Sequence, residues 1–352
     1  VLTPQEADEV LGHVREFAKS GLCTVLIITH KFREVMAYAD SVTVLRRGKA
    51  VHHCRVADTN PAQLAQAMMG GEGASAPAPA SSPVARKPVP DAAPVALRVE
   101  GLEAQGDRGT LALHGLSLAV RAGEILGVAG VSGNGQRELV EALVGQRARL
   151  AGKVSVMGQP YSARRAENRS LKVRSLPEEP LRNACVGDLS VAENMALRDF
   201  DQPPLAWPAL GADVLNFPLW RSRAREWIAE YGVKTQGEGA PIRSLSGGNV
   251  QRAVLARELA GDINVLIAAN PVFGLDFAAV AEIHERIVQV REKGGAVLLI
   301  SEDLDELLEL ADRIVVMSEG RIVFETSAAG AERHVIGAHM GGGHHEPSKA
   351  AA

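Results

Sequence analysis

The 352-residue chain is poor in cysteine and in aromatic residues, with three cysteines, at positions 23, 54 and 185, and 4% Phe, Trp and Tyr. Three scattered cysteines exclude a disulfide framework or a zinc cluster, and they favour a reducing, cytosolic environment. No apolar run approaches the ~18 residues that a membrane-spanning helix requires, so action at a membrane would need a partner. The net charge of −4 disfavours a general nucleic-acid binder, and we expect no nucleic-acid partner.

What the chain does contain is an internal repeat. Hydrophobic residues make up 46% of the sequence, enough for a sizeable core, and the length suggests two globular units. Residues 20–51 resemble residues 293–323, and a shift of 272 places His30 on Glu302. Both segments predict an apolar strand, an amphipathic helix and two short strands around a glycine turn.

The two copies differ in what precedes them. About 175 residues of globular sequence, from about residue 97, lead into the second copy, and almost nothing leads into the first. We therefore expect residues 1–71 to be the C-terminal fragment of one domain and residues 97–342 to be a second, complete domain. The Pro/Ala-rich segment 72–96 predicts a linker, and residues 343–352 predict a disordered tail.

The stretch "GVSGNGQRE" follows an apolar run (123–130) and precedes a predicted helix, which is the setting of a phosphate-binding loop of pattern G-x-x-x-x-G-K-[ST]. The residues that fit the loop are Gly130, Gly133, Asn134 and Gly135. Backbone N–H groups there attract phosphate. Gln136, however, occupies the lysine position and carries no charge, and Arg137 occupies the Ser/Thr position and cannot ligate a cation. By itself this loop leaves open a plain strand-to-helix turn.

A second candidate anion site lies in "SLSGGNVQRAVLAREL" (244–259). Its central residues are Leu245, Ser246, Gly247, Gly248 and Asn249. A hydroxyl and exposed N–H groups at the start of an amphipathic helix suit a phosphate supplied by another surface.

With these motifs, residues 97–342 resemble the second nucleotide-binding domain of a tandem ABC-transporter ATPase of the simple-sugar and nucleoside importer group. Residues 2–71 resemble the end of the first. The motifs follow the family order: phosphate loop, Glu178 at the Q-loop, the signature at 245–249, and "NVLIAANPVFGLD" at Walker B and the D-loop, ending in Asp276. The resemblance implies an α/β P-loop NTPase fold with a helical subdomain near 181–235, and ATP with Mg²⁺ as cofactors.

The resemblance also implies partners and a place. These are transmembrane permease subunits, indirectly a substrate-binding protein, pairing of two nucleotide-binding domains, and the cytoplasmic face of the membrane. It implies a role for His30 as the switch histidine of the first domain. By analogy alone, the loop sequence G-N-G-Q favours a nucleoside over a monosaccharide as the transported molecule.

The second domain departs from a competent ATPase of this kind. Ala269 and Asn270 stand in place of the Walker B aspartate and the catalytic glutamate, Glu302 stands at the switch position, and no aromatic residue precedes Leu111 to stack on adenine. We expect a non-catalytic half that holds Mg²⁺ poorly, if at all, and no ATP hydrolysis by this chain alone. The alternatives are a non-hydrolytic nucleotide-binding or interaction module and an inactive gene fragment.

Overall fold

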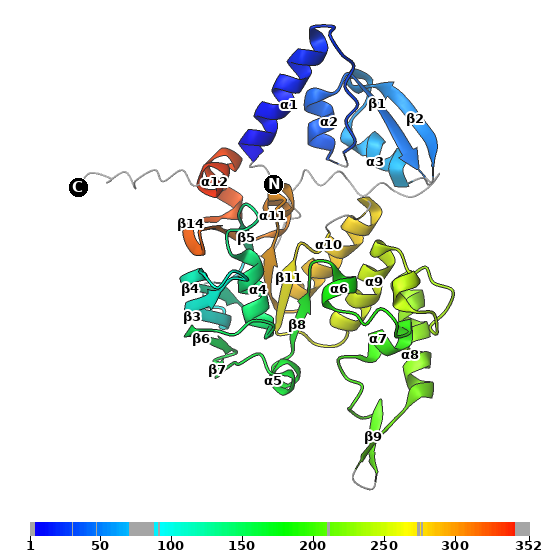
Figure 1. Ribbon diagram of the computed structural model, residues 1–352, viewed down its shortest axis with the longest axis vertical. Helices are drawn as coiled ribbons and strands as arrows, with labels where there is room; N and C mark the ends of the chain where they lie inside the picture. The colour runs from blue at the N-terminus through cyan, green and yellow to red at the C-terminus, as the bar shows by residue number, and fades with distance from the viewer. Residues whose placement is uncertain are drawn as a thin grey trace, which may run out of the picture.

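The computed structural model describes residues 4–29, 31–46, 48–69, 88–90, 92–209, 212–272, 275 and 277–341 (Figure 1). The N-terminal unit consists of α1 (Pro4–Lys19), α2 (Phe32–Tyr38), β1 (Ser41–Arg46), β2 (Lys49–Arg55), η1 (Val56–Asp58) and α3 (Pro61–Met69). β1 and β2 form a two-stranded antiparallel sheet. The larger unit begins with β3 at Val95, just inside the segment expected to be linker.

A six-stranded sheet of order β14-β13-β5-β12-β11-β8 forms the centre of the larger unit. Its strands are β5 (Ile125–Ala129), β8 (Val173–Leu176), β11 (Val265–Ala269), β12 (Ala296–Ile300), β13 (Arg313–Ser318) and β14 (Arg321–Ser327). All neighbouring pairs are parallel except β13–β14. β5, β11 and β12 are buried along their whole length, as expected of strands covered on both faces.

Alternate residues of these strands supply two separate cores. Leu126, Ile267 and Leu298 face a core shared with α4 (Gln136–Val144) and with an antiparallel sheet. That sheet consists of β3 (Val95–Gln105), β4 (Leu111–Arg121), β6 (Ala151–Val156) and β7 (Gln159–Pro160). Leu266 and Leu299 face the opposite core. This second core is covered by α9 (Gly247–Glu258), α10 (Phe277–Glu292), α11 (Leu304–Leu310) and α12 (Arg333–Met340).

The segment expected to be a helical subdomain is mainly helical but contains a hairpin. Its elements are α6 (Pro180–Asn183), α7 (Val191–Ala196), β9 (Ala206–Ala209), β10 (Ala212–Leu215) and α8 (Phe217–Glu230). The β9–β10 hairpin projects from the lower end of the molecule in Figure 1. The short helices α5 (Arg165–Ser170), η2 (Ile242–Ser244) and η3 (Ala328–Gly330) complete the fold.

The internal repeat is confirmed element by element. A shift of 272 residues carries α2, β1, β2 and η1 onto α11, β13, β14 and η3 with identical bounds, and a shift of 273 carries α1 onto α10. The irregularity in strand pairing also repeats, between Val44 and Leu45 in one copy and between Val316 and Met317 in the other. The two copies therefore share one backbone plan in these elements.

One expectation from the repeat was wrong. Residues 23–29 were expected to form a strand like β12, but they have no regular structure, and Leu26 and Ile28 are 88% and 94% exposed. β12 lies between β5 and β11, and residues 23–29 have no strands beside them among the described residues. A strand depends on its ladder partners, so the same apolar pattern gives different structures in the two copies.

A buried ion pair fixes the start of β5. Asp312 accepts hydrogen bonds from the Ile125 N–H at 2.8 Å and from Arg291 Nε and Nη2 at 2.8 and 2.7 Å. Arg291 is only 6% exposed. One carboxylate thus joins β5, the end of α10 and the turn before β13.

We expect Asp312→Ala to lower the free energy of unfolding by about 3–5 kcal/mol, because it removes the carboxylate that forms an ion pair with the buried Arg291. Asp40→Ala is the matched control, since Asp40 is the exposed equivalent in the first copy, and we expect a change within about 0.5 kcal/mol. Chemical denaturation of the full chain measures both. Equal losses for the two variants would contradict the proposed role of Asp312.

Candidate functional site

The carboxyl ends of the parallel strands bring the predicted motifs to one edge of the central sheet. The loop 130–135 follows β5, Asn270 follows β11, Ser301–Asp303 follow β12 and Pro177–Glu179 follow β8. In open α/β sheets this edge is where ligands bind. Motifs separated by more than 100 residues in the chain therefore lie on adjacent strands.

The loop after β5 has the backbone of a phosphate-binding turn. Gly133 and Gly135 have φ of +93° and +101°, which side chains other than glycine's rarely adopt. Asn134 fixes the loop to the β13–β14 turn, because its Oδ1 accepts the Glu319 N–H at 2.9 Å. No side chain caps the N-terminus of α4, so the positive end of the helix is open to an anion.

Gln136 folds back into this loop. Its Nε2 donates to the Val131 carbonyl at 3.1 Å, and the side chain is 9% exposed. Its Oε1 is buried and has no hydrogen-bond partner among the described residues. The amide therefore occupies the inside of the loop with one unsatisfied acceptor, where a lysine would place a positive charge.

Arg137 points to acidic side chains at the exposed surface. It pairs with Asp107 and with Glu141 (3.1 Å), and Arg147 pairs with the same two carboxylates at 2.7 and 2.6 Å. Hydrogen bonds from Arg147 and Arg137 hold the pKa of Asp107 below its usual range. Asp107 lies in the turn that lacks the expected adenine-stacking aromatic, so this charge cluster occupies that side of the site instead.

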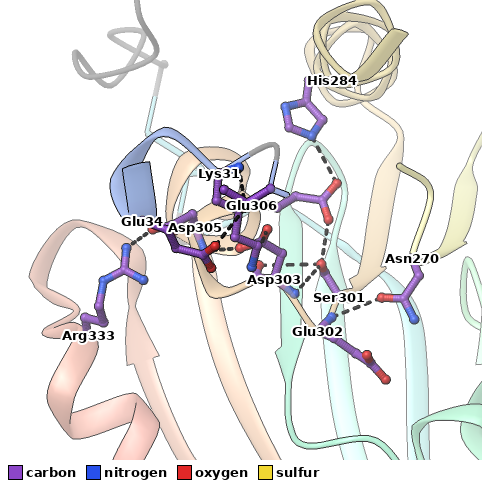
Figure 2. A network of polar contacts seen from close by, with 11 residues as sticks. Lys31, Glu34, Asn270, His284, Ser301, Glu302, Asp303, Asp305, Glu306 and Arg333 are labelled. Carbon is purple, nitrogen blue, oxygen red and sulfur yellow. Dashed lines mark hydrogen bonds and ion pairs between the residues drawn. The ribbon is translucent and has the colours of Figure 1, made fainter. Parts of the chain in front are cut away.

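Asn270 joins the Walker B strand to the switch position. Its φ is +42°, and its Oδ1 accepts the Glu302 N–H at 3.0 Å (Figure 2). Its own N–H donates to the Ile300 carbonyl at 2.8 Å. The carboxamide at the position predicted for the catalytic glutamate thus contacts the end of the neighbouring strand β12.

Behind Glu302 lies a buried polar network that the sequence did not indicate. Ser301 Oγ donates to Glu306 Oε2 at 2.5 Å, and Glu306 Oε1 lies 3.0 Å from His284 Nε2 (Figure 2). Burial alone would lower the pKa of His284, but hydrogen bonds with Glu306 and Glu309 outweigh it and raise that pKa to about 9. A single histidine within α10 carries no motif, so only the fold identifies this network.

The signature residues lie at the first turn of α9. Ser246 is the N-cap residue but makes no side-chain cap, because its Oγ accepts from Asn249 Nδ2 at 2.8 Å. Leu245 is buried, whereas Ser246 and Gly247 are exposed. Gly248 is half-buried beside them. The anion-binding end of α9 is therefore accessible to another surface.

A cavity of about 410 Å³ connects the Q-loop position, the signature and the Walker B end. Pro177, Glu179, Gly247 and Asn270 contribute to its lining. Glu178 is half-buried next to it, and its carbonyl accepts from Asn183 Nδ2 at 2.7 Å. Two predicted residues, His30 and Asp276, lie outside the described residues.

The residues at this edge suit a phosphate better than a magnesium ion. The open helix end and the glycine backbone are donors for an anion. The methyl group of Ala269 offers no ligand, Arg137 is a cation, and Asn270 Oδ1 already accepts a hydrogen bond. Among the described residues, no group of three His, Cys, Asp or Glu side chains could hold a metal ion.

Comparison with known proteins agrees with this fold. A family model described as "ABC transporter" matches residues 113–272, from β4 past the end of β11. The chain contains an ABC ATPase domain. Among solved structures, an ATP-binding cassette dimer with ADP and Pi matches with a TM-score of 0.55 and 19% identity, covering 67% of this chain and 100% of that one. This confirms the predicted P-loop ABC ATPase fold.

Relatives that match almost the whole chain include import ATP-binding proteins. A nucleoside import ATP-binding protein of Lactococcus lactis is 37% identical over 97% of this chain and 65% of its own length. A glucose import ATP-binding protein of Haloferax volcanii is 39% identical over 97% and 60%. A guanosine import ATP-binding protein of Bacillus subtilis is 36% identical over 97% and 65%. The chain spans less than two thirds of the length of these relatives.

We expect the stability of the ABC ATPase domain to fall as pH rises above neutrality. The folded pKa of His284, about 9, lies above the reference value of 6.5, so its contribution is complete below pH 6.5 and is lost as pH rises through 9. The loss is on the order of 3 kcal/mol at most. Urea denaturation between pH 6 and 10 measures it, and the same slope in His284→Gln would contradict the assignment.

Proposed function

We propose that this chain acts as an ATP-binding subunit of an importer for a nucleoside or a simple sugar, and that its ABC ATPase domain is the non-catalytic half of a pair. The import proteins named above support this substrate class, since two carry a nucleoside name and one carries a sugar name. Within this class, the loop sequence G-N-G-Q favours a nucleoside over a monosaccharide.

The proposed non-catalytic role rests on a difference between two parts of the domain, the signature end of α9 and the phosphate loop with the Walker B end. The signature end of α9 is exposed and uncapped, and it can complete a phosphate site on another nucleotide-binding domain. In the domain's own phosphate loop, Gln136 bonds to the Val131 carbonyl and adds no positive charge, and the Walker B end lacks both carboxylates. A bound ATP would supply a phosphoanhydride bond, and the two positions predicted to hold the metal ion and to activate water against it are Ala269 and Asn270.

Partners follow from the same proposal. No helix among the described residues is long and apolar enough to cross a membrane. In the proposed role, permease subunits therefore supply the membrane path, a substrate-binding protein supplies the cargo, and the chain acts from the cytoplasmic face. The helical segment 180–230 and its projecting hairpin are the surface we assign to the permease.

We expect the purified chain to show no ATP hydrolysis above background, because Ala269 and Asn270 replace both carboxylates of the Walker B end. Phosphate release with Mg-ATP measures this. Hydrolysis that is lost in Gln136→Ala but survives Ser246→Arg would place a working site at this loop and would overturn the proposed division of roles.

We expect the combined substitution Gln136→Lys, Arg137→Ser, Ala269→Asp and Asn270→Glu to tighten Mg-ATP binding by at least tenfold, about 1.4 kcal/mol or more. The lysine restores a charge for the phosphates, and the hydroxyl and carboxylates restore help for the metal ion. Calorimetric titration measures the change. The control Ser246→Arg alters the signature only and should leave this affinity unchanged; an unchanged affinity in the fourfold variant would show that the loop is no nucleotide site.

A further inference from the structure

The two copies of the repeat contact each other through equivalent elements. α1 of the first copy packs against α12 of the second, and α10 of the second packs against α3 of the first (Figure 1). Since α1 corresponds to α10 and α3 corresponds to α12, these two contacts exchange when the copies are exchanged. Reciprocal contacts of this kind define a two-fold arrangement, here an approximate one within a single chain.

A salt bridge lies at the position expected for the two-fold axis that relates the two copies. Lys31 Nζ is 3.2 Å from Asp303 Oδ2 (Figure 2). Lys31 and Asp303 are equivalent residues, 272 positions apart, and each is the N-cap residue of its helix, α2 or α11. In a two-fold arrangement, only residues at the axis meet their own equivalents.

The two copies carry opposite charges at this contact. Lys31 of the first copy corresponds to Asp303 of the second. Arg33 of the first copy corresponds to Asp305 of the second. Arg33 and Arg333 pair with Asp8 and Asp305, one ion pair on each side of the contact. Pairing of one copy with its own kind would place two lysines or two aspartates together.

We propose that Lys31 and Asp303 form a charge-matched contact at the pseudo-two-fold axis, which selects pairing between the two unlike repeats of one chain over pairing of like repeats between two chains. The unlike pair attracts, and either like pair repels. Opposite charges thus add specificity to a contact whose shape is nearly the same on both sides.

Covalent connection works in the same direction. Only residues 70–94 separate α3 from β3. A tether of this length keeps one repeat near the other at an effective concentration of about a millimolar or more. The tether favours pairing within one chain. When two chains meet, repulsion between two lysines or two aspartates disfavours the pairing of like repeats.

A double-mutant cycle of charge substitutions in the full chain tests the proposal. The measured quantity is the rate of amide hydrogen exchange in α1. α1 is a 16-residue helix that packs on α2 and α12, and a helix of this length is marginal without tertiary contacts. We expect Lys31→Glu to speed exchange in α1 by about fivefold, because it places two carboxylates at the axis. In the Asp303→Asn background, which keeps an N-cap residue on α11, Lys31→Glu should change exchange by less than twofold. Lys153→Glu, on an exposed part of β6, is the control and should change nothing.

The second measurement is zero-length carbodiimide cross-linking of the native chain, which joins an amine to a carboxylate that it touches. We expect a Lys31–Asp303 link in the species of 37.2 kDa. The proposal is overturned if Lys31→Glu has the same effect with and without Asp303→Asn. It is also overturned if the link occurs only in a species of twice that mass, because the contact would then join two chains. Neither result depends on ATP binding, so the test is independent of the proposed function.

Discussion

The position of β5 between β12 and β13 is the constraint on which the rest of the ABC ATPase domain depends. β5 hydrogen-bonds to both neighbours and is buried on both faces. Its end supplies the phosphate loop and its start is held by Asp312. With β5 in place, the ends of β11 and β12 bring Asn270 and Glu302 into contact. The first copy of the repeat shows the alternative: the apolar residues 25–28 lie exposed, with no strand beside them in the part of the chain that the structure describes.

The site has the backbone of a phosphate-binding loop, and the side chains around it bond to other parts of the protein. Backbone geometry persists because glycine φ values and the helix end depend on local sequence and on the sheet. The side chains, in contrast, have found other partners. Gln136 bonds within the loop, Arg137 bonds to Asp107, and Asn270 bonds to the end of the neighbouring strand. Each of these three side chains is thus held by a partner within the protein.

Motifs and elements with local signals were predictable. The glycine spacing, the fully apolar strands and the signature at the start of α9 follow from short-range rules, and the structure places each at its expected element. Contacts between distant residues were not predictable. Arg137 and Asp107 are 30 positions apart, and His284 and Glu306 are 22 apart, and neither pair has a sequence pattern. The exposed residues 24–28 escaped prediction for the same reason, since strand formation depends on neighbours that no local pattern reveals.

The sequence by itself determined the repeat, the order of the predicted motifs and the presence of Ala269 and Asn270 at the predicted Walker B positions, because each is a property of residue identity and spacing. Only the tertiary structure decided which copy of the repeat forms a full sheet, where the replaced side chains point, and how the two copies meet. The Lys31–Asp303 contact illustrates the difference. The opposite charges are visible in the sequence, but that two equivalent positions touch is a consequence of packing across a pseudo-two-fold axis.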